Sequence, residues 1–259
     1  MSQQDAIELN NELLHLVKGK RVAIVGPAAY LQGKKLSHRF DDYDIVIRPN
    51  EIIPQKNMRL DYGHTTDIMF CNFGTPWMPG IERKIKSEDR EEYFKKLKLV
   101  VCAAIKASHQ DVDYLNWSDD HTSAVVDNFN KINKYELPFY WIGVRDYKRM
   151  HNYMKAEFCT GMASIVMLLH YPIKELLVSG FTFYNGGNAY EELYCPGHMD
   201  DIDTKGRSFG HGGDAQEQQL TFFKKLLHAF EDILKIDPYM DEILQLNHPN
   251  LLEKPLLSL

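Results

Sequence analysis

The sequence predicts an α/β fold with a mostly parallel sheet flanked by helices. Short apolar runs rich in Val, Ile and Leu alternate along the 259 residues with segments of helical periodicity. Strands of parallel sheets have this composition because they are buried on both faces. No Pro- or Gly-rich linker interrupts the sequence, so we expect a single domain over residues 1–259.

The first half of the chain alternates between predicted helices and strands. Leucines at helical spacing predict a helix at 4–18, which Gly19 ends. The other expected elements are strands at 21–26, 43–50, 66–72 and 98–105, a loop with two prolines at 74–80, a charged helix at 87–96 and a helix at 119–134.

The second half opens with a short apolar segment at 139–143 and is expected to end in helices over 215–250. A helix should begin at Thr160, and residues 175–184 have the composition of a strand. Residues 185–213 are rich in Gly and Asp without an apolar period, which is typical of a functional lid or of disorder. A long amphipathic helix follows, with its apolar positions at Leu220, Phe223, Leu226, Leu227, Phe230 and Leu234.

Charge and composition exclude several classes of protein. The net charge of −6 argues against a nucleic-acid binder, which normally carries a basic face. The N-terminus has no signal-type apolar core, and no window approaches the roughly 18 apolar residues of a spanning helix. The four cysteines form no CxxC pair, which favours reduced thiols over a disulfide framework or a zinc site. We therefore expect a soluble, cytoplasmic protein.

Parallel sheets bind ligands beyond the carboxyl ends of their strands, and the stretch Thr160–Gly161 falls at such a place. A glycine lets a phosphate approach the backbone, and the helix that follows directs its N–H groups and positive dipole end at it. Thr160 can cap the helix and donate a hydroxyl. The alternative is an ordinary threonine cap above a core helix.

A second candidate follows the strand at 43–50. Asn50 comes just past the carboxyl end of that strand, close to Arg48, and its amide could recognise a base or a ribose. A turn asparagine next to a surface arginine is the alternative.

Two histidines are candidate catalytic groups. His211 stands between glycines immediately before a helix, where it suits a mobile general base of reference pKa near 6.5. Asp214 and Glu217 then form a capping box for that helix. His198 could stabilise a leaving phosphate when protonated, or could simply be a surface loop residue.

Two acidic stretches, at 41–44 and 200–203, could in principle hold Mg²⁺ or Mn²⁺ on a nucleotide. The first runs directly into a strand, which suits a solvated turn, and the second falls in the irregular segment. We predict no metal site and no cofactor.

Five stretches, in order, resemble the motifs of the animal-type sialyltransferases, glycosyltransferase family twenty-nine. They cover the chain from about residue 21 to 220. They are "VAIVGPAAYL" (22–31), "DIVIRPNEIIP" (44–54), "DYGHTTDI" (61–68), "CTGMASIVMLLHYPIKELLVSGF" (159–181) and "HGGDAQ" (211–216).

This resemblance implies a single GT-A-like (Rossmann-type) domain and an inverting glycosyltransferase that needs no metal. The enzyme would move sialic acid, or a related sugar such as Kdo, from a CMP-sugar to a hydroxyl of a glycan acceptor. His211 would deprotonate the acceptor, and His198 matches the histidine of another motif. The nucleotide-binding residues that it implies are Gly26, Pro27, Ala28, Arg48, Asn50, Thr160, Gly161 and Met162.

The chain departs from the family pattern at several positions. Pro27 and Tyr30 stand where the family has asparagines, and Gln216 stands where it has a glutamate. Val22 and Pro172 occupy the positions of the family's bridging cysteines, which fits a reducing compartment. The alternatives are therefore a transferase that uses another nucleotide sugar, or a nucleotide-binding module of the same fold without transferase activity.

Overall fold

Seven parallel strands form one sheet in the computed structural model of the chain. The structure describes residues 9–50, 56–71, 87–102, 126–127, 129–131, 133–154, 159–183 and 213–252. The strands are β1 (Arg21–Val25), β2 (Ile45–Pro49), β3 (Ile68–Phe70), β4 (Leu99–Cys102), β5 (Phe139–Trp141), β6 (Glu175–Ser179) and β7 (Leu234–Ile236). Their order in the sheet is β5-β4-β3-β2-β1-β6-β7, with each neighbouring pair parallel. The predicted α/β class and parallel sheet are confirmed.

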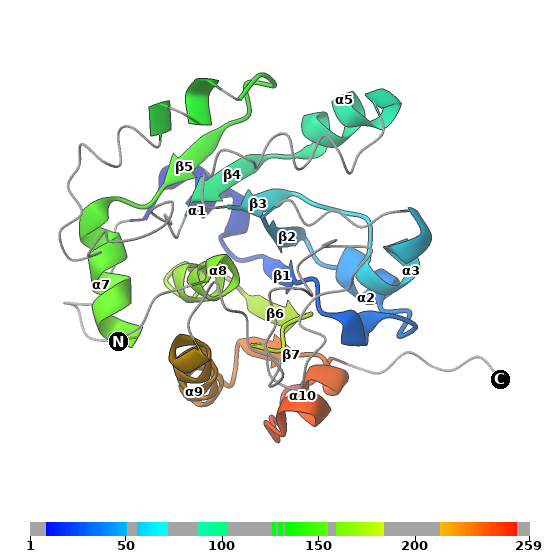
Figure 1. Ribbon diagram of the computed structural model, residues 1–259, viewed down its shortest axis with the longest axis vertical. Helices are drawn as coiled ribbons and strands as arrows, with labels where there is room; N and C mark the ends of the chain where they lie inside the picture. Colours follow the sequence, from blue (N-terminus) through cyan, green and yellow to red (C-terminus); the bar gives the residue numbers. More distant parts are fainter. Residues whose placement is uncertain are drawn as a thin grey trace.

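Helices cover both faces of this sheet (Figure 1). The helices α7 (Val144–Met154), α8 (Thr160–Leu168) and α9 (Gly213–Ala229) lie on one side of it. On the other side lie α2 (Ser37–Asp41) and α3 (Arg59–Tyr62). The remaining helices are α1 (Asn11–Val17), α5 (Ser87–Lys96) and α10 (Pro238–Leu244), and the 3-10 turns are Ala29–Leu31 and Lys56–Met58. Of the helices that the structure describes, none has the length and apolar character to cross a membrane.

The order of the strands defines a switch point between β1 and β6. From β1 the chain adds strands outward to β5, then crosses back through α7 and α8 to place β6 on the other side of β1. The register pairs Ala23 with Val46 on one side and with Leu177 on the other. Connections that leave two neighbouring strands in opposite directions open a crevice at their carboxyl ends.

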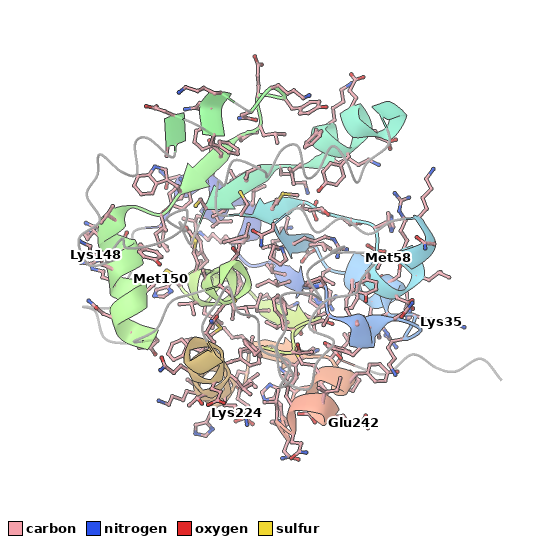
Figure 2. The ribbon with its side chains drawn as sticks, in the orientation of Figure 1. Lys35, Met58, Lys148, Met150, Lys224 and Glu242 are labelled. Carbon is pink, nitrogen blue, oxygen red and sulfur yellow. The ribbon has the colours of Figure 1, made fainter. Side chains whose placement is uncertain are left out.

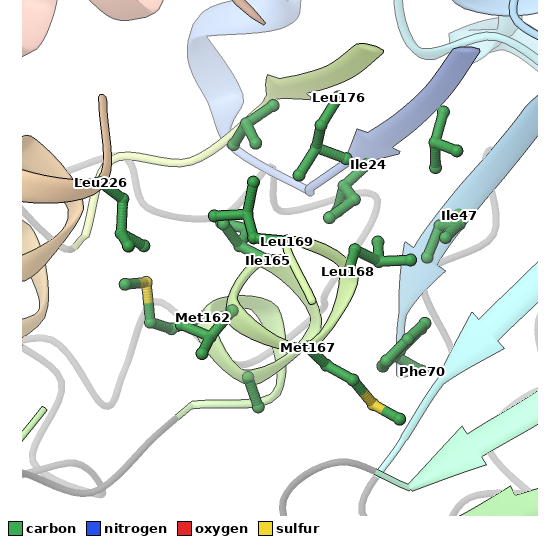
Figure 3. Packing of buried hydrophobic residues seen from close by; sticks show 14 of the residues in the cluster. Ile24, Ile47, Phe70, Met162, Ile165, Met167, Leu168, Leu169, Leu176 and Leu226 are labelled. Carbon is green, nitrogen blue, oxygen red and sulfur yellow. The ribbon is translucent and has the colours of Figure 1, made fainter. Parts of the chain in front are cut away.

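The helix α8 is buried along its whole length. Each residue from Thr160 to Leu168 is buried, and an apolar surface on all sides is what a central helix requires. Figure 3 shows its leucines and methionines between the sheet residues Ile24, Ile47 and Phe70 and Leu226 of α9. This packing fixes the head of α8 relative to the strands.

The opposite face of the sheet has its own core. Val46 and Tyr62 belong to that cluster together with Met58, whereas Met150 of α7 belongs to the α8 side. Figure 2 labels these two methionines on opposite sides of the sheet.

The predicted first helix begins later than expected. Within the described residues it starts at Asn11, because the Asn10 side chain accepts a hydrogen bond from the Leu13 N–H and so caps the first turn. The predicted strands at 21–26, 43–50, 66–72 and 98–105 and the charged helix at 87–96 correspond to β1, β2, β3, β4 and α5. The helix α7 was not predicted.

The helices expected over 215–250 are present as α9 and α10, but a strand that was not predicted separates them. Leu234, assigned by periodicity to the long helix, is the first residue of β7, which pairs with β6 in parallel. The helix α9 ends at Ala229 because Leu234 and Ile236 are buried by joining the sheet edge. The expected role of Asp214 as N-cap is also wrong, since α9 already includes Gly213 and Asp214 lies inside it.

Two expected elements fall outside the described residues, the loop at 74–80 and the irregular segment up to residue 212. The expected helix at 119–134 is described only in part. Residues 126–127 and 129–131 are helical, and the helix has ended by residue 133.

A polar cluster joins β6 to its neighbours at the amino edge of the sheet. The Tyr43 hydroxyl donates to Glu175 (2.6 Å), and Lys235 and Arg21 form ion pairs with the same carboxylate at 3.1 and 3.5 Å. Burial alone would raise the pKa of Glu175, but the hydrogen bonds of Tyr43 and Lys235 and the nearby cations lower it.

We predict that Glu175→Gln lowers the free energy of unfolding by roughly 1 kcal/mol at pH 7, since charge-assisted hydrogen bonds are lost. A carboxyl group whose folded pKa is lowered stabilises the fold above its unfolded pKa of about 4.3 and loses that contribution as the pH falls through the folded pKa. Urea unfolding of both proteins from pH 7 to pH 3 should show the difference shrinking. A difference that stays constant over this range would contradict the ionic role.

Candidate functional site

The ends of β1 and β6 meet at the switch point through their backbones. The Gly26 N–H donates to the Ser179 carbonyl (2.8 Å), and the Ala28 N–H donates to the Gly180 carbonyl (3.1 Å). A Cβ at Gly26 would collide with the Gly180 carbonyl. Gly180 has a φ of +79° and its own Cβ would meet the Gly26 backbone, so both positions require glycine.

The β1 loop offers no backbone donor at residues 26–28. The N–H groups of Gly26 and Ala28 serve β6, and Pro27 has none. The carbonyl of Ala28 accepts from the Tyr62 hydroxyl at 3.0 Å. All three loop residues are buried. This loop therefore cannot cradle a phosphate with its N–H groups.

The head of α8 lies at the same edge. Cys159 is the N-cap, and its Sγ accepts from the Met162 N–H (3.4 Å). The expected capping role of Thr160 is therefore wrong: Thr160 is the first helical residue and is only 4% exposed. The N–H groups of the first turn point along the helix axis, where an anion would be stabilised.

One aromatic ring connects the loop with the helix. A Cβ built on Gly161 would collide with the ring of Phe181, and a Cβ on Gly26 would lie 3.1 Å from the same ring. Phe181 follows β6 and is half-buried. Gly161 was predicted to let a phosphate approach the backbone. The structure gives another reason for the glycine, because any side chain at this position would collide with the Phe181 ring.

Helix α9 also reaches the head of α8. The Gln219 side chain, 3% exposed, accepts from the Cys159 N–H at 3.2 Å. Because α9 begins at Gly213, the chain that carries His211 enters this helix a few residues before the contact. His211 and His198 themselves lie outside the described residues.

Arg48 is fully buried on the other side of the sheet. Ile47 packs in the α8 cluster and Val46 in the opposite one, so alternation directs Arg48 away from α8. Its guanidinium donates to the carbonyls of Tyr62 (2.7 Å) and Thr65 (3.1 Å). Arg48 therefore positions the segment before β3, and we no longer expect it to contact a nucleotide.

Asn50 directly follows β2 at the carboxyl edge, and β2 is the neighbour of β1 in the sheet. Asn50 adopts a φ of +54°, which asparagine tolerates better than most residues, and its N–H donates to the Phe70 carbonyl. The side chain is half-buried. Asn50 therefore shares the edge with the Gly26 loop and the α8 head, and its contact with a nucleotide stays a prediction.

Met162 lies in the core instead of the site. Its side chain is 0% exposed within the α8 cluster, and Figure 3 labels it there. Because the Met162 N–H donates to Cys159 Sγ, we no longer expect Met162 to contact a nucleotide.

The acidic stretch at 41–44 lies at the amino edge, away from the site. Asp41 pairs with His64 Nδ1 (2.9 Å), and Asp44 accepts from the Arg21 N–H (2.8 Å). Burial alone would raise the pKa of Asp41, but the hydrogen bond of Thr65 and the charge of His64 lower it. In the described part of the chain no three His, Cys, Asp or Glu side chains gather as metal ligands would. The second stretch, 200–203, lies outside the described residues.

Sequence reasoning missed four residues that build this edge: Tyr30, Phe181, Gln219 and Asp237. Each acts through a contact between distant parts of the chain. Tyr30 was noted only as a departure from the family pattern, and Phe181 only as the end of the stretch that begins at Cys159. The Asp237–Pro238 pair, a typical helix start, could have indicated the capping role of Asp237.

Comparison with known proteins gives a likeness of fold. No family model and no curated protein sequence matches the chain. The sialyltransferase CstII from Campylobacter jejuni, in complex with cytidine-5'-monophosphate, matches with 16% identity and a TM-score of 0.54, covering 92% of this chain and 86% of that chain. The same enzyme in complex with a trisaccharide acceptor and CMP has 15% identity and a TM-score of 0.51, with 91% and 87% covered. A mammalian sialyltransferase has 15% identity and a TM-score of 0.51, with 89% and 74% covered.

We predict that Gly161→Ala destabilises the protein by about 1–2 kcal/mol. Alanine is favoured over glycine inside a helix by about 1 kcal/mol, but overpacking against the Phe181 ring costs about 1–3 kcal/mol. In a Phe181→Leu background the same change should become neutral or stabilising. Urea unfolding of the four proteins measures this coupling, and an unchanged cost in the double variant would contradict the contact.

Proposed function

We propose that the protein is a glycosyltransferase of the sialyltransferase type, which transfers a sugar from a CMP-sugar to a glycan hydroxyl. One observation carries the proposal. Two of the stretches that resemble the family's motifs, 22–31 and 159–181, meet at one edge of the sheet through the contacts among Gly26, Gly180, Phe181 and Gly161. The likeness to sialyltransferase structures with bound CMP supports it.

The donor would bind across the switch point between β1 and β6. Its phosphate would face the first turn of α8, where Thr160 adds a hydroxyl and the helix dipole favours negative charge. The N–H groups of Gly26 and Ala28 are bonded to β6 and Pro27 has none, so Pro27 would contact the base or ribose with its apolar ring. Asn50 would contact the nucleotide from the neighbouring strand. The donor sugar would be sialic acid, or a related sugar such as Kdo.

The reaction would be an inverting displacement. His211 would take the proton of the acceptor hydroxyl, whose oxygen forms a bond to the anomeric carbon as the bond from that carbon to the CMP phosphate oxygen breaks. CMP would leave with the bonding electron pair, and a protonated His198 would stabilise the phosphate. No metal or cofactor is needed for these steps.

The cellular setting belongs to the same proposal. Cys71, Cys102 and Cys159 form no disulfide in the described part of the chain, and Val22 and Pro172 stand where the family has bridging cysteines. Both observations suit a cytoplasmic enzyme, whose partners would be a nucleotide sugar and a glycan.

A nucleotide-binding module without transferase activity is the second candidate. Pro27 replaces a residue with a side-chain amide, and the backbone donors of the β1 loop are already used by β6. Such a module would bind CMP but would not turn over a donor.

We predict that CMP raises the melting temperature in buffer that contains EDTA. A ligand at 100 times its Kd stabilises the native state by about 2.7 kcal/mol, and UMP, which differs only in the base, should give a smaller shift. Thr160→Val should keep the melting temperature of the free protein and reduce the CMP shift, since a hydrogen bond to a charged group contributes about 1.5–3 kcal/mol. A shift that appears only with UMP, or only after Mn²⁺ is added, would contradict the proposed donor site.

We predict that His211→Ala lowers transfer from CMP-sialic acid to a trisaccharide acceptor by about 10²–10⁴-fold, the usual contribution of a general base. The affinity for CMP, measured by calorimetry, should stay within about twofold of wild type, because the base acts on the acceptor. His228→Ala, an exposed histidine in the last turn of α9, is the matched control and should change neither property. Wild-type turnover in the His211 variant would place the base elsewhere, and absence of turnover in the wild-type protein would favour the binding module.

A further inference from the structure

A buried carboxylate divides its two oxygens between a helix and the candidate site. Oδ1 of Asp237 accepts from the N–H groups of Tyr239 (3.0 Å) and Met240 (2.8 Å), and so caps α10. Oδ2 accepts from the hydroxyls of Tyr30 (2.6 Å) and Ser179 (2.7 Å). Asp237 is 0% exposed, and burial raises its pKa even though these four hydrogen bonds act in the opposite direction.

The Tyr30 hydroxyl connects this carboxylate with the backbone of the site. It donates to Asp237 and accepts from the Gly180 N–H at 2.7 Å. Burial and the neighbouring Asp237 raise the pKa of Tyr30, so the phenol keeps its proton and remains a donor. A single hydroxyl thus holds the left-handed turn at Gly180 from the side of α10.

This arrangement holds the β1 loop at both ends. The N–H groups of Gly26 and Ala28 are bonded to the carbonyls of Ser179 and Gly180. Tyr30, in the 3-10 turn that follows, is anchored to Asp237 and Gly180. The loop, the β6 turn and the start of α10 are therefore joined by one network whose members lie far apart in the sequence.

We infer that Tyr30 and Asp237 are positioning residues that set nucleotide affinity by holding the Gly26–Ala28 loop against the β6 turn. The inference rests on the proposed function for the identity of the nucleotide. Tyr30 stands where the family that the sequence resembles has an asparagine, and here its hydroxyl is bonded to Asp237 and to the Gly180 N–H.

The other edge of the sheet provides a matched control. Tyr43 donates to Glu175 at 2.6 Å, the same distance as between Tyr30 and Asp237, and it also reaches β6. Tyr43 lies just before β2 and Glu175 begins β6, so this second pair is at the amino edge. Tyr43→Phe and Tyr30→Phe remove the same hydroxyl from the same kind of pair at opposite ends of the sheet.

The experiment compares these two variants in the full chain, well below both melting temperatures. Calorimetry with CMP should show an affinity about tenfold weaker in Tyr30→Phe, the equivalent of about one net hydrogen bond, and a wild-type affinity in Tyr43→Phe. Amide hydrogen exchange by NMR should be faster at Gly26 and Ala28 in Tyr30→Phe only. Neither amide bonds to Tyr30 directly, so faster exchange there reports on the position of the loop.

Each result decides the inference. Exchange at Gly26 and Ala28 that is equal in the two variants overturns it, and so does faster exchange with CMP affinity equal to that of Tyr43→Phe. If wild type binds no CMP, the proposed function fails, and the exchange comparison alone decides whether Tyr30 holds the loop. If Tyr30→Phe does not fold, Ser179→Ala, which removes the other hydroxyl from Oδ2 of Asp237, should give a smaller change in the same direction.

Discussion

The close approach of Gly26 and Gly180 is the contact on which the candidate site depends. The two backbones meet where β1 and β6 end, and a side chain on either residue would push the strands apart. Strand order reverses at this pair, which is where parallel sheets of this kind bind their ligands. The ring of Phe181 then extends the contact to Gly161 and ties the head of α8 to the same place.

This contact also decides which chemical groups the crevice can present. Bonding to β6 uses the N–H groups of the β1 loop, so an anion at this edge has its backbone donors at the head of α8. The loop residues 26–28 are buried and have no N–H group left for a phosphate. Under the proposed function, a nucleotide would lie between this loop and the head of α8, the two elements that Phe181 connects.

The two edges of the sheet use similar bonds for different purposes. At the amino edge, the Tyr43–Glu175 pair and the cations around it stabilise the junction of β1, β6 and β7. At the carboxyl edge, the half-buried Tyr30 bonds to the buried Asp237 and to the backbone of the candidate site. Because the two pairs lie at opposite ends of the strands, we expect changes in one to leave the other intact.

The sequence by itself determined the parallel α/β class, five of the strand positions among residues 21–179 in outline, the helix at 87–96 and the head of α8, because buried strands and helix termini leave local patterns. It also indicated that Gly26, Asn50 and Thr160 share one edge. Only the tertiary structure decided that Leu234 joins the sheet, that Arg48 and Met162 face away from the site, and that Cys159 caps α8. The hydrogen bond from Tyr30 to Asp237 joins residues that are 207 positions apart in the sequence. Such a contact produces no repeating pattern in the sequence, because it forms only when the folded sheet brings its strand ends together.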